Sequence, residues 1–342
     1  MRATPGGILT SFAVAGWGIA LPERRVTNAE LAARIDTTDE WIVARTGIRE
    51  RRVSGAGDST GTLALGAARQ ALASAQLEPA QVDLVIVATC TPDRMIPSTA
   101  ATVVAALATS AGAFDINAAC AGFVHGLVVT AGLIGSGIVR TVLLVGAEST
   151  TRVADPDDRS TAVLFGDGAG AAVLTADRGS SSGLVACDLV NDPDGIDLLV
   201  QPAGGHLRMD GGEVFRRAVR AAAESVDRTL TRAGCRPEDV TLFVPHQANA
   251  RMSEALVARV GISTDRTVST VHRHANTSSA SIPLAMADPV AEGRLADDDL
   301  VLVCGFGAGL TVATALWRWA GRARTTGGRS AMPSNGAGAP PH

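Results

Sequence analysis

Cys120 is the first residue whose type and setting indicate covalent chemistry. It stands in Ala118-Ala-Cys-Ala-Gly122, after an apolar run that ends near Ile116 and where a helical pattern begins. The unpaired N–H groups and the dipole of a first helical turn favour a thiolate there. Small neighbours leave room for a tight turn and for an approaching substrate. Taken alone, however, the segment is more typical of an inert, packed cysteine.

His246 and Asn276 are two further polar residues beside apolar segments. His246 follows directly on the strand-like run Phe243-Val-Pro245, so we expect it to project from a strand end. Asn276 lies in the small, polar segment 273–283, which leads into a helix. A lone histidine is more often structural, and a loop asparagine is usually a cap or a turn residue. Together with Cys120 they are more informative, because all three stand at predicted strand-to-helix junctions, where α/β folds place their sites.

Apolar runs of strand length alternate with alanine-rich helical stretches, and these elements must position the three residues. Residues 83–89 and 141–146 indicate buried strands, and residues 62–75 and 122–138 indicate helices with apolar residues at three- and four-residue steps. Continuous apolar strands separated by helices predict parallel sheets that are covered on both faces.

A faint internal repeat suggests two similar halves. Residues 163–174 and 302–313 share a Gly-x-Gly-Ala-Gly core between apolar runs, and residues 240–245 resemble the strand that ends near Thr89. Two α/β halves packed together would create a site at their junction, where strand ends from both halves converge.

The bulk composition argues against several other classes of protein. The chain has 342 residues, 46% of them hydrophobic, which is enough for a large core. Its net charge is −4, so nothing in the overall balance indicates a nucleic-acid partner, and its basic residues are all arginines. Five scattered cysteines without a CxxC pair argue against a disulfide scaffold and a metal site, and fit a reducing cytoplasm.

The two ends of the chain differ in character. Residues 8–22 are apolar enough for a signal-peptide core, but Gly16-Trp-Gly18 interrupts them and no cleavage pattern follows, so a buried first strand is favoured. No run reaches the ~18 apolar residues that span a membrane, and we expect a cytoplasmic protein without a membrane contact. Residues 321–342, rich in Gly, Ser, Pro and Arg, are predicted to be a disordered tail.

Six motifs, in order between about Leu9 and Trp319, resemble those of one known family. They are Asp39-Glu-Trp-Ile-Val-Ala-Arg-Thr-Gly-Ile-Arg-Glu-Arg51, Asp115-Ile-Asn-Ala-Ala-Cys-Ala-Gly-Phe123, Phe165-Gly-Asp-Gly-Ala-Gly-Ala-Ala-Val-Leu174, Val244-Pro-His-Gln-Ala-Asn249, His274-Ala-Asn-Thr-Ser278 and Gly305-Phe-Gly-Ala-Gly309. On these motifs the sequence is similar to β-ketoacyl-acyl-carrier-protein synthase III, the initiating condensing enzyme of fatty-acid synthesis. The resemblance implies a thiolase-like α/β fold with mixed sheets in an α-β-α-β-α arrangement. Residues 1–178 would form the half that carries the nucleophile, and residues 179–320 the half that carries His246 and Asn276.

The resemblance also implies a mechanism. Cys120 would attack an acyl-CoA and become S-acylated, and the backbone N–H groups of Cys120 and Ala308 would form the oxyanion hole. Malonyl-acyl-carrier protein would then lose CO₂, and His246 Nε2 and Asn276 Nδ2 would hold the enolate oxygen while it attacks the acyl group. Phe306 matches a phenylalanine beside the catalytic histidine. No cofactor and no metal are implied, because coenzyme A enters as part of a substrate.

Substrate contacts follow from the same resemblance. Trp41 and Arg45, with Arg159 nearby, would bind the adenine of coenzyme A by stacking, and Gly211 and Asn249 would line the pantetheine tunnel. Basic residues at the matching positions Arg216, Arg251 and Arg259 would dock the acidic carrier protein. The chain is expected to form a homodimer in which Ile96 reaches across the interface to floor the partner's acyl pocket. A branched, mid-sized residue there predicts a pocket that is not restricted to acetyl.

Residues 202–215 are shorter than expected for the family, which would either open the tunnel mouth or be a harmless surface deletion. An open mouth gives some weight to an alternative enzyme, an acyltransferase of secondary metabolism that moves the acyl group to an alcohol or a carrier. A catalytically silent partner is a third hypothesis, against which the presence of Cys120 argues. A nucleotide-binding protein is excluded by the glycine spacing of residues 166–170 and the absence of lysine. The acyl group, the pathway and whether the donor is bound to CoA or to a carrier stay open.

Overall fold

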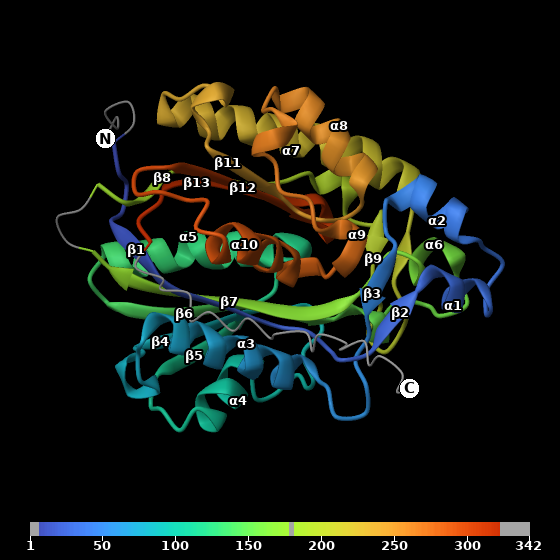
Figure 1. The fold of residues 1–342 in the computed structure, drawn as a ribbon, viewed down its shortest axis with the longest axis horizontal. Helices are drawn as coiled ribbons and strands as arrows, with labels where there is room; N and C mark the ends of the chain where they lie inside the picture. Colours follow the sequence, from blue (N-terminus) through green and yellow to red (C-terminus); the bar gives the residue numbers. More distant parts are fainter. Residues whose placement is uncertain (1–6, 178–180, 322–342) are drawn as a thin grey trace, which may run out of the picture.

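A computed structural model describes residues 7–177 and 181–321, and two stacked sheets between layers of helix make up their fold (Figure 1). The strands are β1 (Phe12–Ala20), β2 (Arg25–Thr27), β3 (Glu50–Arg52), β4 (Leu84–Ala88), β5 (Gly112–Ile116), β6 (Thr141–Ser149), β7 (Asp167–Ala176), β8 (Gly183–Asn191), β9 (Leu199–Val200), β10 (Arg208–Met209), β11 (Leu242–Pro245), β12 (Leu300–Gly307) and β13 (Thr311–Arg318). The helices are α1 (Asn28–Ala32), α2 (Asp39–Thr46), α3 (Thr60–Ala75), α4 (Thr99–Ala106), α5 (Gly122–Gly135), α6 (Arg159–Ala162), α7 (Gly211–Ala233), α8 (Ala250–Val260), α9 (Val271–His274) and α10 (Ser281–Ala291). Three short 3₁₀ turns contain or adjoin the residues predicted for the site: η2 (Ala119–Ala121), η7 (Ser278–Ala280) and η8 (Ala308–Leu310).

The first sheet has the strand order β1-β7-β6-β4-β5 within the described residues. β4 pairs in parallel with β5 and β6, whereas β7 is antiparallel to β6 and to β1. Helices α3 and α4 cover its outer face (Figure 1). Leu63 and Leu72 of α3 pack there against Val85 and Leu143 of the sheet, which buries the apolar stripe that the helical spacing predicts.

The second sheet, β11-β12-β13-β8, repeats this order. Its first strand, β8, pairs antiparallel with the last strand, β13, which is antiparallel to β12, and β12 is parallel to β11. Helices α7 and α8 cover its outer face. The two similar halves predicted from the repeat are therefore present in the topology. The glycine motif itself does not superpose on this repeat, because residues 166–170 lie at the start of β7, whereas residues 305–309 end β12 and enter η8.

Helices α5 and α10 form the buried central layer between the two sheets (Figure 1). Phe123 of α5 and Met286 of α10 pack in one cluster with Ile86 of the first sheet and Val303 of the second. The order of layers is α-β-α-β-α, as the resemblance implies. Both central helices begin close to the segments that carry Cys120 and Asn276, so the buried central layer supports these residues.

The parallel sheets predicted from the apolar runs are wrong, since both sheets are mixed, as the family resemblance implies. The runs of apolar residues arise because helices cover both faces of each sheet, and this burial is the same for either strand direction. The apolar stretch within residues 8–22 is the strand β1, as expected. The proposed boundary at residues 178/179 and the proposed tail beyond Gly321 lie outside the described residues.

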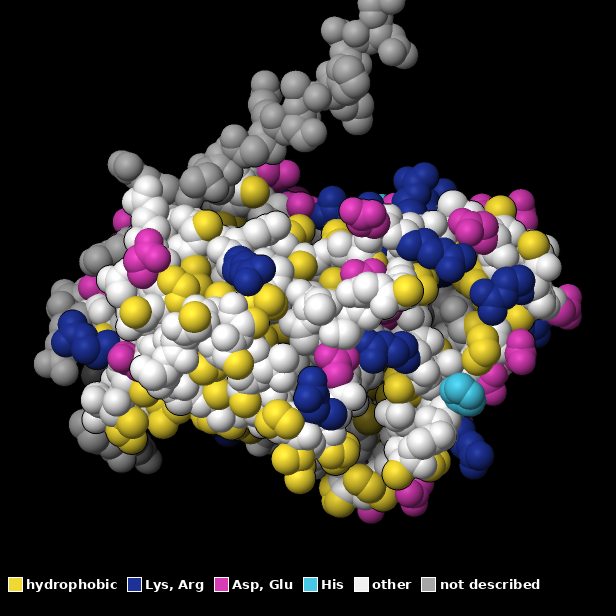
Figure 2. All heavy atoms as spheres, turned by 90° about the horizontal axis from the view of Figure 1, so that it is seen from below, with side chains coloured by type: hydrophobic (Ala, Val, Ile, Leu, Met, Phe, Trp, Pro, Cys, Tyr) yellow, Lys and Arg dark blue, Asp and Glu magenta, His cyan; other side chains and the backbone are white. Residues whose placement is uncertain are grey.

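The described helices include none that is long and apolar enough to cross a bilayer. On the face that α3 and α4 cover, arginine and acidic side chains are interspersed, and apolar side chains gather along its lower margin (Figure 2).

Candidate active site

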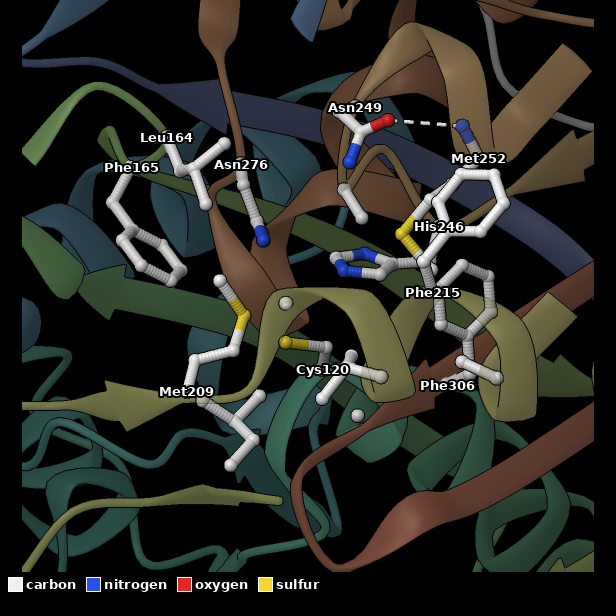
Figure 3. A pocket seen from close by; sticks show the side chains of 16 residues that line it. Cys120, Leu164, Phe165, Met209, Phe215, His246, Asn249, Met252, Asn276 and Phe306 are labelled. Carbon is white, nitrogen blue, oxygen red and sulfur yellow. Dashed lines mark hydrogen bonds between the residues drawn. The ribbon is translucent and has the colours of Figure 1, made fainter. Parts of the chain in front are cut away.

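Cys120, His246 and Asn276 line one cavity of about 160 Å³ at the junction of the two halves (Figure 3). Cys120 comes from the first half, and His246 and Asn276 come from the second. In Figure 3 the sulfur, the imidazole ring and the amide nitrogen of Asn276 point toward the same space. The structure thus brings together the three residues that the sequence singles out.

Cys120 lies in η2, between the end of β5 and the first residue of α5. The preceding residue, Ala119, has a φ of 45°, a left-handed conformation that costs a non-glycine residue about 1–2 kcal/mol. Burial raises the pKa of the Cys120 thiol to about 12. The thiolate expected from a helix N-terminus is therefore wrong, and Cys120 is a thiol near pH 7. Cys120 precedes α5 rather than lying in its first turn, so desolvation outweighs the dipole.

His246 directly follows β11, and its backbone N–H donates to the backbone carbonyl of Cys304 in β12 at 2.8 Å. Its imidazole is 1% exposed, with Nδ1 at 2.6 Å from Ser281 Oγ. The ring meets Phe306 edge to face, with centroids 5.1 Å apart. Burial lowers the pKa of His246 to about 3, so the ring is neutral near pH 7. A neutral imidazole offers one N–H and one lone pair, which suits hydrogen bonding to a substrate oxygen.

Asn276 does not follow a strand, as the sequence suggests, but lies between α9 and η7. Its backbone is held against the first half, because Asn276 N–H donates to Leu164 O at 2.9 Å and Gly166 N–H donates to Asn276 O at 3.0 Å. The side-chain oxygen accepts from Ser278 N–H at 2.8 Å. With Oδ1 engaged in this way, Nδ2 is the atom that faces the cavity (Figure 3).

Glu148, near the end of β6, anchors the segment that carries Asn276. It is fully buried and accepts hydrogen bonds from Thr91 Oγ1 at 2.6 Å, Thr89 Oγ1 at 3.1 Å and Ser278 Oγ at 3.0 Å. The backbone N–H groups of Cys90 and Thr91 donate to the same carboxylate. These donors compensate a buried charge. The negative charge of Glu148 also adds to the rise in the pKa of the Cys120 thiol.

The loop after β12 passes directly over the Cys120 turn. A Cβ added at Gly307 would lie 2.7 Å from the backbone nitrogen of Cys120, and one at Gly305 would lie 2.8 Å from the Cα of Ala121. Glycine is therefore required for this close approach. Ala308 follows as the first residue of η8, so its backbone belongs to the loop that borders the nucleophile. Its role as an oxyanion donor stays a prediction.

Gly211 and Asn249 also line the cavity, together with Phe306. Asn249 caps α8, since its Oδ1 accepts from Met252 N–H at 2.9 Å (Figure 3). Residues 202–215 contain β10, which pairs with β9, and Leu199 and Met209 of this small sheet form part of the cavity wall. This small sheet thus borders the site.

Trp41, Arg45 and Arg159 form a cluster at the surface, outside the lining of the cavity. The guanidinium carbon of Arg159 lies 4.7 Å from the centroid of the Trp41 ring, and that of Arg45 lies 5.6 Å from it. Arg159 also donates to Asp36 O at 3.0 Å. The indole is therefore flanked by two cations, an arrangement that can stack a planar, electron-rich ring.

The residues predicted to dock the carrier protein and to reach across the dimer interface lie on the surface. Arg216 and Arg259 border a groove between α7 and α8, and Arg251 is exposed on α8. The same groove contains Arg220, which the sequence analysis does not single out. Ile96 is 87% exposed and lies outside the cavity of its own chain.

Sequence reasoning also missed Glu148, Ser278 and Ser281. Both serines stand in the quoted segment 273–283, but their type alone does not distinguish a cap from a partner of a catalytic residue. Glu148 was detectable as a charged residue at the end of the apolar run that forms β6, where a buried carboxylate needs several donors.

Comparison with known proteins gives a consistent result. The family model described as 3-oxoacyl-[acyl-carrier-protein] synthase III matches residues 114–193, which include Cys120. The model of its C-terminal part matches residues 230–319, which include His246 and Asn276. The β-ketoacyl-[acyl-carrier-protein] synthase III of Roseiflexus castenholzii is 46% identical over 323 residues, covering 90% of this chain and 98% of the relative.

Solved structures agree with this. The crystal structure of 3-oxoacyl-(acyl carrier protein) synthase III from Pseudomonas aeruginosa PAO1 matches with a TM-score of 0.86 and 44% identity, over 90% of this chain and 98% of that one. The priming β-ketosynthase of the R1128 polyketide pathway matches with a TM-score of 0.85 and 36% identity, over 93% of this chain and 98% of that one. The chain has the thiolase-like fold and belongs to the β-ketoacyl-acyl-carrier-protein synthase III family.

Proposed function

We propose that the protein is an initiating ketosynthase that takes an acyl group from acyl-CoA onto Cys120 and condenses it with malonyl-acyl-carrier protein. The products are a β-ketoacyl thioester, CO₂ and CoA. The observation that carries this proposal is the convergence of Cys120 with two neutral donors, His246 and Asn276, in one cavity. A transferase to an alcohol would need a base to activate that alcohol, and a histidine with a pKa of about 3 is a weak base.

Acyl transfer comes first. The Cys120 sulfur forms a bond to the thioester carbon, the carbon–sulfur bond to CoA breaks, and the thiol proton passes to the departing CoA sulfur. Because the resting group is a thiol, this proton needs no external acceptor overall. The tetrahedral oxyanion is stabilised by the N–H groups of Cys120 and Ala308, and donors of this type are worth about 3–4 kcal/mol each.

Condensation follows when the malonyl thioester enters. Loss of CO₂ leaves an enolate whose oxygen accepts hydrogen bonds from His246 Nε2 and Asn276 Nδ2. The enolate carbon attacks the acyl carbonyl on Cys120, the carbon–sulfur bond breaks, and the released sulfur takes a proton from solvent. Decarboxylation supplies the carbanion, so the site needs preorganised donors and no strong base. The neutral His246 and the fixed amide of Asn276 are such donors.

Coenzyme A is proposed to bind with its adenine between Trp41 and Arg159. The guanidinium carbon of Arg159 lies 4.7 Å from the centroid of the Trp41 ring. An adenine inserted between them needs about 7 Å, which is twice a van der Waals contact of about 3.5 Å. Arg159 must therefore move aside by a few ångströms, and its exposed position permits this.

The acidic carrier protein is proposed to dock on the groove of Arg216, Arg220 and Arg259, with Arg251 nearby.

A homodimer is proposed through the edge of the first sheet. β5 is one of its two edge strands, and Phe114 on it is exposed. Met95 and Ile96 are 88% and 87% exposed, which is unusual for side chains of this kind in an isolated chain. A second copy seated there would cover them and bring Ile96 toward the partner's site.

The proposal is tested by incubating the protein with a series of acyl-CoAs, with and without malonyl-carrier protein, while intact mass and CO₂ release are followed. We expect an acyl adduct on the wild type but not on Cys120→Ala, then malonyl-dependent loss of CO₂ and a β-ketoacyl product. An adduct that forms but never condenses would support the acyltransferase instead. No adduct with any donor would contradict both.

A further inference from the structure

The hydroxyl of Ser281 lies 2.6 Å from Nδ1 of His246, and both side chains are buried, at 2% and 1% exposure. A ring nitrogen can donate or accept in such a contact, so the distance alone leaves two arrangements. In one, Ser281 donates to Nδ1 and the ring proton is on Nε2. In the other, Nδ1–H donates to Ser281 and Nε2 carries a lone pair into the cavity.

The second contact of Ser281 distinguishes these arrangements. The backbone N–H of Gln247 donates to Ser281 Oγ at 3.4 Å. The oxygen thus already accepts one hydrogen bond, and within residues 7–177 and 181–321 its own hydrogen has Nδ1 of His246 as the acceptor in reach. If Nδ1 were the donor, two N–H groups would point at Ser281 and its hydroxyl hydrogen would be buried without a partner, which costs about 1–3 kcal/mol. The hydrogen-bond count therefore favours Ser281 as donor.

Ser281 is also held rigidly enough to impose this choice. It is the first residue of α10, which is pinned to β1 where Trp17 Nε1 donates to Pro283 O at 2.9 Å. The chain around it presses on the first sheet, since a Cβ at Gly146 would lie 2.5 Å from Ser279 O and one at Gly170 would lie 2.7 Å from Pro283 Cβ. With so little room for movement, the hydroxyl stays aimed at the ring.

We propose that Ser281 is a positioning residue that fixes His246 in the Nε2–H tautomer, so that the ring presents a donor, not a lone pair, to the enolate oxygen. This inference rests on the proposed condensation. It assigns Ser281 to the second half-reaction only, because acyl transfer to Cys120 relies on backbone donors. The same segment then orients both side-chain donors, with Ser278 N–H holding the amide of Asn276 and Ser281 holding the imidazole.

The test separates the two half-reactions in Ser281→Ala. We expect single-turnover acylation of Cys120, followed by intact mass, to stay within about 3-fold of wild type. Condensation of the isolated acyl-enzyme with malonyl-carrier protein should fall in kcat by about 10- to 100-fold, with little change in KM, as for other residues that orient a catalytic group. Ser281→Thr keeps the hydroxyl and should restore condensation at least partly. Ser225→Ala removes a buried hydroxyl that pairs with Thr314, outside the lining of the cavity, and is the matched control for lost stability.

A spectroscopic measurement addresses the tautomer directly. In protein labelled with ¹⁵N-histidine, His246 is assigned by its loss in His246→Asn, and its two ring nitrogens are distinguished by their shifts. We expect a protonated Nε2 and an unprotonated Nδ1 in the wild type, and a mixture of tautomers in Ser281→Ala. A wild-type Nε2 without a proton, equal slowing of both half-reactions, or unchanged condensation in Ser281→Ala would each overturn the inference. A wild-type acyl-enzyme that never condenses would instead contradict the proposed function. The ¹⁵N measurement would still test whether Ser281 fixes the tautomer of His246.

Discussion

Gly307 approaches the backbone of Cys120 so closely that a Cβ at this position would lie 2.7 Å from the Cys120 nitrogen and 3.1 Å from its Cβ. The two residues come from opposite halves of the molecule, Cys120 after β5 and Gly307 at the end of β12. Their contact joins the nucleophile to the loop that carries Ala308. It is also where the proposed oxyanion hole is assembled, so its geometry can be tested by adding a single carbon.

Gly307→Ala should reduce acylation of Cys120 by at least about 100-fold, because the loop must shift and the Ala308 N–H moves away from the oxyanion. Acylation is measured by rapid quench and intact mass. Gly132→Ala is the control. This glycine lies in the exposed part of α5 with open space around its Cα, so alanine should stabilise the helix by about 0.5–1 kcal/mol and leave acylation unchanged. Normal acylation in Gly307→Ala would contradict the proposed role of the loop.

Acid should destabilise the protein through His246. Its pKa is about 3 in the folded state and near 6.5 when unfolded, so the unfolded state binds more protons between these values. The contribution of neutral His246 is fully present above pH 6.5 and is lost as the pH falls toward 3, by about 1.4 kcal/mol per pH unit. Urea unfolding of wild type and His246→Asn, compared between about pH 7 and pH 5, isolates this group. Parallel pH dependences of the two proteins would exclude a depressed pKa for His246.

Trp41→Ala should raise KM for acyl-CoA by about 5- to 30-fold with little change in kcat, since loss of stacking on adenine costs about 1–2 kcal/mol. Initial rates over a range of acyl-CoA concentrations give both constants. An acyl group delivered on carrier protein has no adenine, so the same variant should use it normally. Arg69→Ala, at an exposed arginine of α3 outside the Trp41 cluster, should behave as wild type. If Trp41→Ala impaired both donors equally, the cluster would be structural instead.

Glu148→Gln should lower the free energy of unfolding by about 2–4 kcal/mol, because an amide nitrogen would face N–H and O–H donors that now point at a carboxylate. Condensation should also fall, since Ser278 loses its anchor and with it the hold on Asn276. Chemical denaturation and the condensation assay measure the two effects. The matched change at an exposed glutamate away from the docking groove, Glu292→Gln at the end of α10, should alter neither. A stable, fully active Glu148→Gln would show that the carboxylate charge is dispensable.

Several elements were predictable from local pattern. The helix predicted at residues 62–75 is α3, and the strand predicted at residues 83–89 is β4, each to within two residues at either end. Periodicity succeeded there because one apolar face meets one layer of core. Strand direction was not predictable in this way, and the sheets are mixed. The direction depends on how the last strand of each half folds back beside the first, a long-range pairing that leaves no mark on the local sequence.

The candidate site was likewise predictable only in part. Residue type and motif were enough to single out Cys120, His246 and Asn276, since few other side chains can attack a thioester or donate to an enolate. They were not enough for the protonation state of Cys120. The neighbours of Cys120 in sequence suggested a thiolate, but burial makes it a thiol. Desolvation depends on every segment that surrounds a group, and for Cys120 these include β12 from the other half.

By itself, the sequence determined the family and the alternation of strands and helices, and it singled out the three polar side chains that converge in the cavity, because each of these depends on residues close together in the chain or on their order. Only the tertiary structure decided that Cys120 is a thiol, that Ser281 and Glu148 hold the donors in place, and that Gly307 lies against Cys120. The partners in these contacts are up to 187 positions apart, as in Cys120 and Gly307, and their distance, burial and hydrogen bonding exist only once the two halves are packed together.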